Sequence, residues 1–247
     1  MSQQRTEAVV LHGIDYSETS RIITFLTPDR GRFACMAKGV RRKNSPLAAI
    51  LDTMNRVELI YYWKDGRSVQ QLTDATALDN FMPIKADLER SAFAALPLEI
   101  VGKVAHENEP SFALYATLVH GMESLSTWTG DVRVHACWQA LQLLNAAGHA
   151  PSTTVCVECG QLLPEPKDWP QPPGFAYHGG VTCTQCRADV GLTADVYTAL
   201  RALVESPDAC PSIDRVKGLG KIVSQFAMRQ LETDLRSVRV INEMFGR

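Results

Sequence analysis

Four cysteines in the middle of the sequence have the spacing of a metal site. Cys156 and Cys159 form one CxxC pair, and Cys183 and Cys186 form a second pair after 23 intervening residues. Thiolates at positions i and i+3 reach one ion through a tight turn, and two such pairs supply the four ligands that tetrahedral Zn²⁺ prefers. Because cysteine fills all four positions, none remains for water or substrate. The pattern therefore predicts one structural zinc ion per chain.

The segment between the two pairs cannot build a core of its own. Residues 161–182 include five prolines and three glycines, which exclude a continuous helix. Gly160 follows the first pair directly and permits a turn whose backbone N–H groups point at sulfur. We expect the metal to supply the missing order.

Two disulfides or a redox dithiol are the alternatives for these cysteines. The first apolar run, Ala8–Leu11, is too short for a signal peptide, so we expect a cytoplasmic, nucleoid-associated chain with reduced thiols. A redox CxxC usually begins a helix after a strand, whereas these pairs lie in loops rich in proline and glycine. We expect the remaining cysteines, Cys35, Cys137 and Cys210, to be small buried side chains.

The bulk composition is that of a globular protein with two or three domains. The chain has 247 residues, of which 45% are hydrophobic, and it contains no apolar stretch long enough for a membrane span. The net charge of −2 excludes a global attraction to nucleic acid. Basic residues slightly outnumber acidic ones in residues 1–80, and the reverse holds afterwards, which favours the front segment for an anionic partner.

Five short runs rich in β-branched and aromatic residues predict a small barrel in residues 1–80. The runs are Ala8–Leu11, Arg21–Leu26, Arg32–Ala37, Arg56–Tyr62 and Val69–Thr73. The longest break, residues 39–51, lies between the third and fourth runs, where an OB-fold carries its helix or long loop. We predict an OB-fold, and the pattern leaves an SH3-like barrel or a half-sandwich open.

The same break opens with the densest positive charge in the chain. Lys38, Arg41, Arg42 and Lys43 lie within six residues on a loop that contains glycine, which is typical of phosphate contacts. Further candidates head neighbouring strands: Arg21, Arg32 and Arg56. Strand aromatics could stack on bases or fill the core: Phe25, Phe33, Tyr61, Tyr62 and Trp63. A merely solvated loop is the alternative for the charge run.

The pattern becomes helical after residue 81. Apolar residues recur three and four positions apart in Ile84–Ala105, Ser111–Ser126, Val132–Ala147, Ala194–Val204 and Lys217–Phe245. We predict an α+β multidomain protein with an OB-fold in residues 1–80, a helical bundle in 81–150, an inserted four-cysteine zinc module in 151–190, and C-terminal helices in 191–247 that pack on the bundle.

No catalytic constellation accompanies these elements. The sequence lacks a phosphate-binding GxxxxGK[ST], a GxSxG elbow and an HExxH motif. The six histidines are scattered, and only His149 and His178 lie near enough to the cysteines to be alternative ligands. We predict a protein that is not an enzyme.

The front segment resembles the bacterial recombination mediator family RecO. The resemblance rests on residues 9–18, on residues 21–27 with Gly31, and on the Ala37–Arg42 run AKGVRR, where the family often has alanine in place of Val40. The helical middle, the CxxC pairs and a C-terminal helix follow in the family's order. Since some members lack the four cysteines, the resemblance implies that the zinc module supports folding.

The resemblance implies an OB-fold protein that binds single- and double-stranded DNA and anneals complementary strands. With RecR, such proteins help load RecA onto DNA coated by single-strand-binding protein, whose acidic, apolar C-terminal tail they contact through the helical domain. The family motif carries DNA contact to Lys38, Arg41 and Arg42, and Lys43 joins them by adjacency.

Two other functions stay open. A zinc-ribbon module for RNA binding or transcription would contact nucleic acid through its cysteine knuckles, but the knuckle residues Val157, Glu158, Thr184 and Gln185 carry no positive charge. An interaction scaffold would have no salt-dependent affinity for DNA at all. We therefore favour the DNA-binding mediator.

Overall fold

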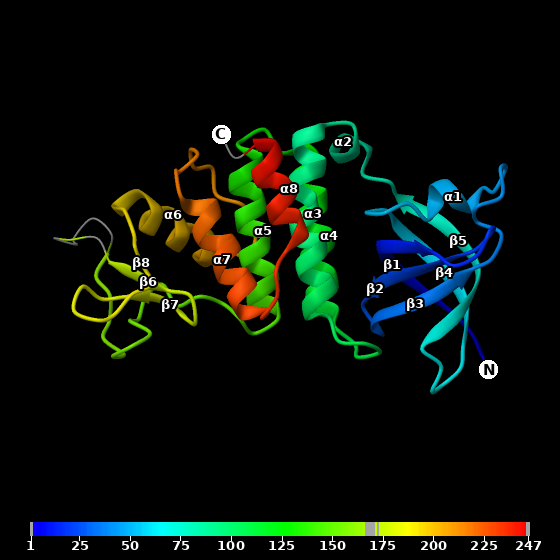
Figure 1. The fold of residues 1–247 in the computed structure, drawn as a ribbon, viewed down its shortest axis with the longest axis horizontal. Helices are drawn as coiled ribbons and strands as arrows, with labels where there is room; N and C mark the ends of the chain where they lie inside the picture. Colours follow the sequence, from blue (N-terminus) through cyan, green and yellow to red (C-terminus); the bar gives the residue numbers. More distant parts are fainter. Residues whose placement is uncertain (1, 166–170, 172, 246–247) are drawn as a thin grey trace. The chain divides into compact units, whose positions relative to one another are not determined.

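The computed structural model of the chain describes residues 2–165, 171 and 173–245 (Figure 1). The chain divides into two compact units. Unit 1 consists of Met1–Leu88 and Val101–Ser126, and unit 2 consists of Glu89–Ile100 and Thr127–Arg247. No helix in the described ranges is long and apolar enough to cross a membrane. The predicted four-part division of the chain stays a prediction.

Unit 1 is built around a closed five-stranded barrel with the strand order β1-β2-β3-β5-β4. The strands are β1 (Ser2–Asp15), β2 (Arg21–Thr27), β3 (Gly31–Ala37), β4 (Arg56–Trp63) and β5 (Val69–Asp79). Neighbours are antiparallel except β3 and β5, which are parallel. A short helix, α1 (Leu47–Ile50), lies between β3 and β4. This connectivity is that of the predicted OB-fold.

Alternating side chains explain why these segments become strands. Along β3 and most of β4, buried and more exposed residues alternate, which places one row of side chains inside the barrel. Phe33 lies at the centre of that core, with its ring centroid 5.0 Å from Tyr61 and 5.8 Å from Trp63. β1 begins six residues earlier than predicted because Ser2–Glu7 pairs with β4 despite its polar composition.

One glycine fixes the turn between β2 and β3. Gly31 has a φ of +57°, and a Cβ atom there would lie 2.0 Å from the carbonyl oxygen of Glu109. The neighbouring Arg32 donates its backbone N–H to His106 and accepts one from Asn108. The barrel therefore packs its β2–β3 turn directly against residues 106–109 of the same unit.

Helices complete unit 1. α2 (Met82–Lys85) starts after Phe81, which has a φ of 48°, and α4 (Phe112–Thr127) follows later in the chain. Tyr115 of α4 donates its hydroxyl to Glu7 of β1 over 3.0 Å, and Arg56 of β4 bonds to Glu7 and to Glu123 of α4. This network fastens α4 to the barrel.

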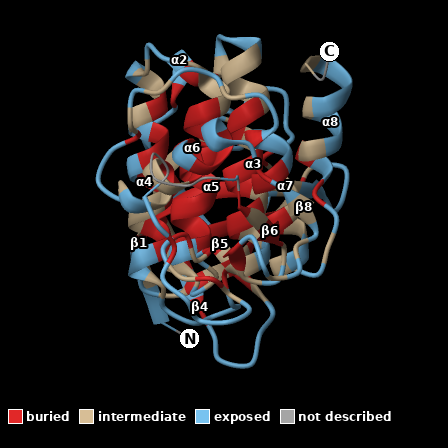
Figure 2. Ribbon diagram, turned by 90° about the vertical axis from the view of Figure 1, so that its left-hand side faces the viewer, coloured by how far each residue is buried: buried red, intermediate tan, exposed pale blue. Residues whose placement is uncertain are grey.

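Unit 2 is arranged around α5 (Val132–Ala146), which is buried along most of its length (Figure 2). It packs against α6 (Ala194–Glu205) and α7 (Leu219–Gln230). Trp138 donates its indole N–H to the carbonyl of Ser206 over 2.7 Å, and Gln142 donates to Leu203 over 2.8 Å. The buried polar groups of α5 thereby bind the C-terminal end of α6.

The C-terminal helical segment is two helices rather than the one predicted for residues 217–245. α7 ends at Gln230 and α8 (Arg236–Phe245) begins six residues later. Glu232 between them has a φ of 48°, a left-handed conformation that no helix interior accommodates. The carboxylate of Glu99, on α3 (Leu88–Val104), accepts hydrogen bonds from the backbone N–H groups of Arg236 and Ser237. The prediction of a single helix was wrong because apolar periodicity continues across the break.

A small sheet in the cysteine region was not predicted. Its strands are β6 (Gly174–Ala176), β7 (Gly180–Thr182) and β8 (Val190–Gly191), in the order β7-β6-β8. Gly180 has a φ of +135°, and a Cβ there would lie 2.3 Å from the carbonyl oxygen of Ser152. Glycines that lowered the strand signal in the sequence are thus required for the close approach of these backbones.

Candidate nucleic-acid interface and metal centre

The four predicted metal ligands converge. The sulfur atoms of Cys156, Cys159, Cys183 and Cys186 all lie within 4.8 Å of one another, and those of Cys159 and Cys183 are 3.9 Å apart. Zn–S bonds of about 2.3 Å in a tetrahedron place sulfurs about 3.8 Å apart. The cluster therefore has the dimensions of a tetrahedral site with four cysteine ligands.

Two tight turns bring the thiols together. Gly160 has a φ of +75° and donates to the carbonyl of Cys156 over 2.9 Å, as the first knuckle requires. β7 leads directly into Cys183, whose backbone N–H points at the Cys156 sulfur over 3.2 Å. The predicted role of Gly160 in this turn is confirmed, and so is the N–H to sulfur hydrogen bonding.

The pKa values of the four thiols indicate that a cation is needed for all of them to ionise together. Burial raises the pKa of the Cys156 thiol, but backbone N–H groups of Cys183, Cys159 and Glu158 outweigh burial and lower that pKa to about 6. The neighbouring thiols of Cys183 and Cys159 raise the pKa of Cys186 to about 12. One thiolate thus forms readily, whereas four adjacent thiolates require a positive ion among them. The donor set fits Zn²⁺.

The other candidate ligands and cysteines lie elsewhere. His149 hydrogen-bonds Gln230, and His178 lies 3.4 Å from Glu158, so neither belongs to the sulfur cluster. Burial raises the pKa of Cys35 to about 12, and that of Cys210 likewise. Such thiols stay protonated at neutral pH, in agreement with the prediction of small buried side chains.

The loop after β3 presents three free cations. Lys38, Arg42 and Lys43 are exposed, and none of them forms an ion pair within the part of the chain that the structure describes. Val40 between them is 2% exposed and belongs to the barrel core. Val40 therefore anchors the loop while the charged side chains face solvent. We call residues 38–43 the cationic loop.

Arg41 joins the cationic loop to the β1–β2 loop, residues 16–20. Its backbone N–H donates to Thr19 over 3.1 Å, and its guanidinium donates to the carbonyl of Ser17 over 2.7 Å. The guanidinium also lies 3.2 Å from Asp15, which pairs with Arg21 over 2.8 Å. Arg21 and Arg41 thus lie beside the free cations, with part of their charge offset by Asp15.

Arg32 and Arg56 lie at the other end of the barrel. Arg32 is the second residue of β3 and lies five residues before Ala37, which is roughly 17 Å along the strand. It pairs with Glu107, whereas Arg56 pairs with Glu7 and Glu123. Their contact with DNA stays a prediction, and the ion pairs indicate a role in fastening α4 and the loop between α3 and α4 to the barrel.

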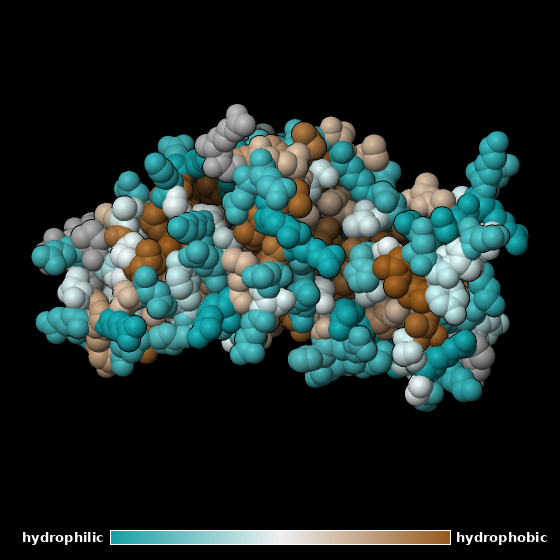
Figure 3. Space-filling view, in the orientation of Figure 1, coloured by the Kyte–Doolittle hydropathy of each residue, from teal (hydrophilic) through white to brown (hydrophobic). Residues whose placement is uncertain are grey.

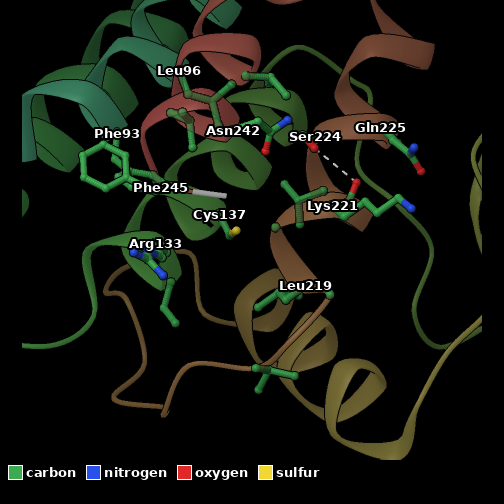
Figure 4. A pocket seen from close by; sticks show the side chains of 18 of the residues that line it. Phe93, Leu96, Arg133, Cys137, Leu219, Lys221, Ser224, Gln225, Asn242 and Phe245 are labelled. Atoms are coloured by element: carbon green, nitrogen blue, oxygen red, sulfur yellow. Dashed lines mark hydrogen bonds between the residues drawn. The ribbon is translucent and has the colours of Figure 1, made fainter. Parts of the chain in front are cut away.

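Unit 2 contains a groove of about 400 Å³ that sequence reasoning did not assign (Figure 4). Its apolar wall includes Phe93 of α3 and Phe245 of α8, whose ring centroids are 5.6 Å apart. No acidic residue of the described ranges lines it, and the basic lining residues are Arg133, Arg215, Lys217 and Lys221. The groove combines an apolar floor with a positive rim, and no single stretch of sequence encodes that combination.

Family models match both parts of the chain. The model described as Recombination protein O N terminal matches residues 1–81, and the model described as Recombination protein O C terminal matches residues 85–239. The DNA repair protein RecO of Streptomyces griseus is 32% identical over 98% of this chain and 100% of the relative. The DNA repair protein RecO of Heliobacterium modesticaldum is 30% identical over 81% of this chain and 72% of the relative. The chain belongs to the RecO family of DNA repair and recombination proteins.

Proposed function

We propose that this protein binds DNA through the cationic loop and anneals complementary strands as a recombination mediator. The observation that carries the proposal is a set of three exposed cations at one end of an OB barrel, none of which forms an ion pair with another described residue. Phosphates bound there release counterions, which is the main source of affinity in sequence-independent DNA binding. Single- and double-stranded DNA both present that backbone.

Annealing by such a surface needs no covalent chemistry. Two strands repel each other through their phosphates, and cations that neutralise both strands lower this repulsion while the bases find their partners. No bond forms or breaks except hydrogen bonds between bases. We therefore propose a protein that is not an enzyme.

Membership of the RecO family supports three protein partners. We propose that, together with RecR, the protein helps load RecA onto DNA coated by single-strand-binding protein. The groove of unit 2 suits the acidic, apolar C-terminal tail of that coating protein, because its apolar floor accepts hydrophobic side chains and its basic rim accepts carboxylates. In Figure 4, Lys221 extends away from Phe93 and Phe245, whereas Arg133 lies close to them, with its guanidinium 5.8 Å from the centroid of the Phe93 ring.

The cysteine cluster supports one structural Zn²⁺ per chain. The ion would take all four thiolates and hold residues 151–165 against the β6–β8 sheet. It would leave no open position for water, so its contribution would be to folding alone.

Charge reversal in the cationic loop tests DNA binding. Fluorescence polarisation with a labelled oligothymidylate across a salt series should show binding that weakens steeply with salt. Arg42→Glu with Lys43→Glu should weaken binding at least tenfold and flatten the slope by roughly one to two units, because two phosphate contacts are lost. These positions are preferable to Arg41, which also holds the β1–β2 loop.

A matched control changes the same net charge elsewhere. Lys103→Glu with Arg239→Glu alters two exposed cations outside the barrel and should leave affinity and slope almost unchanged. Equal effects of both double variants would show that only net charge matters. Absence of binding by the unaltered protein at low salt would refute the proposed function.

The groove is tested with an acidic peptide that ends in apolar residues. Lys217→Glu with Lys221→Glu should weaken peptide binding about tenfold, while Arg42→Glu with Lys43→Glu, which reverses two charges in the barrel unit, should retain it. Unchanged peptide affinity in the groove variant would place the tail elsewhere.

A further inference from the structure

The barrel buries most of its aromatic side chains. Phe25, Phe33, Tyr61 and Trp63 are between 0% and 9% exposed and pack on one another in the core. Bases cannot stack on them without opening the barrel. If the surface around the cationic loop contacts the bases of a single strand as well as its phosphates, the aromatic rings that stack on those bases must come from other residues.

Tyr16 is exposed in the way that a stacking residue requires. It lies at the start of the β1–β2 loop with 66% of its surface exposed, against 37% for Tyr62. An exposed aromatic ring offers a free face on which a partner ring can stack. Its hydroxyl forms no hydrogen bond within the residues that the structure describes, so no contact within those residues occupies the side chain.

Several hydrogen bonds hold the loop that carries Tyr16 in place. The backbone N–H of Tyr16 donates to Ser20 over 3.0 Å, and Ser20 donates in turn to the hydroxyl of Ser17 over 3.2 Å. Arg41 of the cationic loop bonds to Ser17, Thr19 and Asp15. These bonds hold the loop that carries Tyr16 against Arg41 of the cationic loop.

An outward-facing row of side chains continues from this point around the barrel. The strand register pairs Ile14 with Ile22, Ile22 with Met36, Met36 with Gln71, and Gln71 with Tyr62. None of the five is buried, and Ile14 is 55% exposed. Figure 3 shows hydrophobic side chains at the surface over β2 and β3. Strands lie about 4.8 Å apart, so the row runs for roughly 19 Å.

The row and the cations form one surface. Met36 is separated from Lys38 by a single residue, so the apolar row passes the base of the cationic loop. Single strands are held by other proteins through the same combination, in which a positive groove follows the backbone and aromatic faces accept successive bases.

We propose that Tyr16 stacks on a base of single-stranded DNA and that the row Ile14, Ile22, Met36 and Tyr62 continues this base-contacting strip. The inference rests on the proposed DNA binding and adds to it a preference for exposed bases. Phosphates lie on Lys38, Arg42 and Lys43, while bases turn toward the barrel. Duplex DNA, whose bases already stack on one another, gains nothing from the strip, so an annealed product is held less firmly than its single strands.

Oligonucleotides with and without bases test the strip. We would measure binding of a labelled oligothymidylate and of an abasic sugar-phosphate strand of equal length. Tyr16→Ser should weaken oligothymidylate binding roughly tenfold, leave abasic binding unchanged and preserve the salt slope, because no phosphate contact is lost. Tyr16→Phe should retain binding, since a phenyl ring also stacks.

The outcomes separate this inference from the function on which it rests. Absence of salt-dependent binding by the unaltered protein would refute both. Suppose that the unaltered protein binds DNA and that Arg42→Glu with Lys43→Glu abolishes binding. If Tyr16→Ser then binds like the unaltered protein, the proposed base-contacting strip is wrong, and the proposed DNA binding by the cationic loop is supported. Equal loss of both oligonucleotides in Tyr16→Ser would also overturn stacking. Equal urea midpoints for the variants would exclude a folding defect.

Discussion

At the scale of single residues, one carboxylate connects three elements of unit 1. Glu7 of β1 accepts hydrogen bonds from Arg56 of β4 and from Tyr115 of α4. The hydrogen bond from Arg56 lowers the pKa of Glu7 below its ordinary value, despite the opposing effect of burial. Burial and the nearby Glu7 together raise the pKa of Tyr115 to about 12. The network is therefore fully formed at neutral pH, with Glu7 ionised and Tyr115 protonated.

This arrangement predicts a pH-dependent contribution to stability. A carboxyl whose pKa is lowered by folding stabilises the protein above its ordinary pKa, near 4.5, and loses that effect as pH falls through the lower folded value. Because Glu7 is partly exposed, we expect Glu7→Gln to lower the free energy of unfolding by only about 0.5–1 kcal/mol at pH 7. Urea unfolding should show that the difference in free energy of unfolding between the unaltered protein and Glu7→Gln becomes smaller below pH 4.5. A gap independent of pH, or an equal gap for Glu18→Gln, would contradict the prediction.

Two glycines with the same backbone conformation predict very different costs of substitution. Gly31 and Gly66 have φ values of +57° and +72°, but only Gly31 lies against another backbone. Gly66→Ala should cost about 1 kcal/mol, the ordinary penalty of the left-handed conformation. Gly31→Ala should cost about 3 kcal/mol or more, because residues 106–109 must move as well. Urea unfolding compares the two, and similar losses would show that the β2–β3 turn yields easily.

At the scale of elements, the sequence patterns located strands and helices better than they located their ends. Short runs rich in β-branched and aromatic residues predicted all five barrel strands, but polar Ser2–Glu7 carries no strand signal and joins β1 only because β4 offers it partners. The break before α8 depends on the backbone of Glu232, a residue type that helices usually favour. Pairing partners and single dihedral angles come from tertiary structure, so local patterns do not reveal them.

The N-terminus of α8 predicts a link between helix stability and the groove. Glu99 caps Arg236 and Ser237, while Val238, Ile241 and Phe245 of the same helix line the groove. Glu99→Ala should remove about 1 kcal/mol of capping. Hydrogen exchange across residues 236–245 should become faster, and binding of the acidic peptide several-fold weaker. Glu99→Gln, which keeps one acceptor oxygen, should have an exchange rate and a peptide affinity between those of the unaltered protein and Glu99→Ala. Unchanged exchange would mean that α8 is held by its apolar face alone.

At the scale of the whole molecule, the candidate sites belong to separate units. The cationic loop and the Tyr16 strip lie in unit 1, whereas the groove and the cysteine cluster lie in unit 2. The sequence predicted the cysteine cluster completely, because four ligands at fixed spacing need no tertiary information. It did not predict the groove, whose walls come from segments more than a hundred residues apart, such as Phe93 and Phe245. Nor could it distinguish buried Phe33 from exposed Tyr16.

This separation predicts the effect of removing the proposed zinc ligands. Cys156→Ser with Cys159→Ser should abolish bound zinc, measured by elemental analysis, and speed hydrogen exchange in residues 151–165 and 173–192. DNA affinity should stay within about twofold, since the barrel folds around its own core. Cys210→Ser, outside the sulfur cluster, is the control and should retain one metal per chain. Zinc retained in the double variant would contradict the ligand assignment.

Asp15 limits the affinity of the proposed DNA-binding surface for DNA. Its carboxylate lies between Arg21 and Arg41, beside the free cations, and competes with every phosphate that approaches them. A protein that joins two strands must also release the duplex before it can start again, so maximal affinity would end each cycle in a trapped product. If the proposed annealing is correct, the negative charge of Asp15 beside Arg21 and Arg41 would weaken DNA binding and thereby favour release of the duplex.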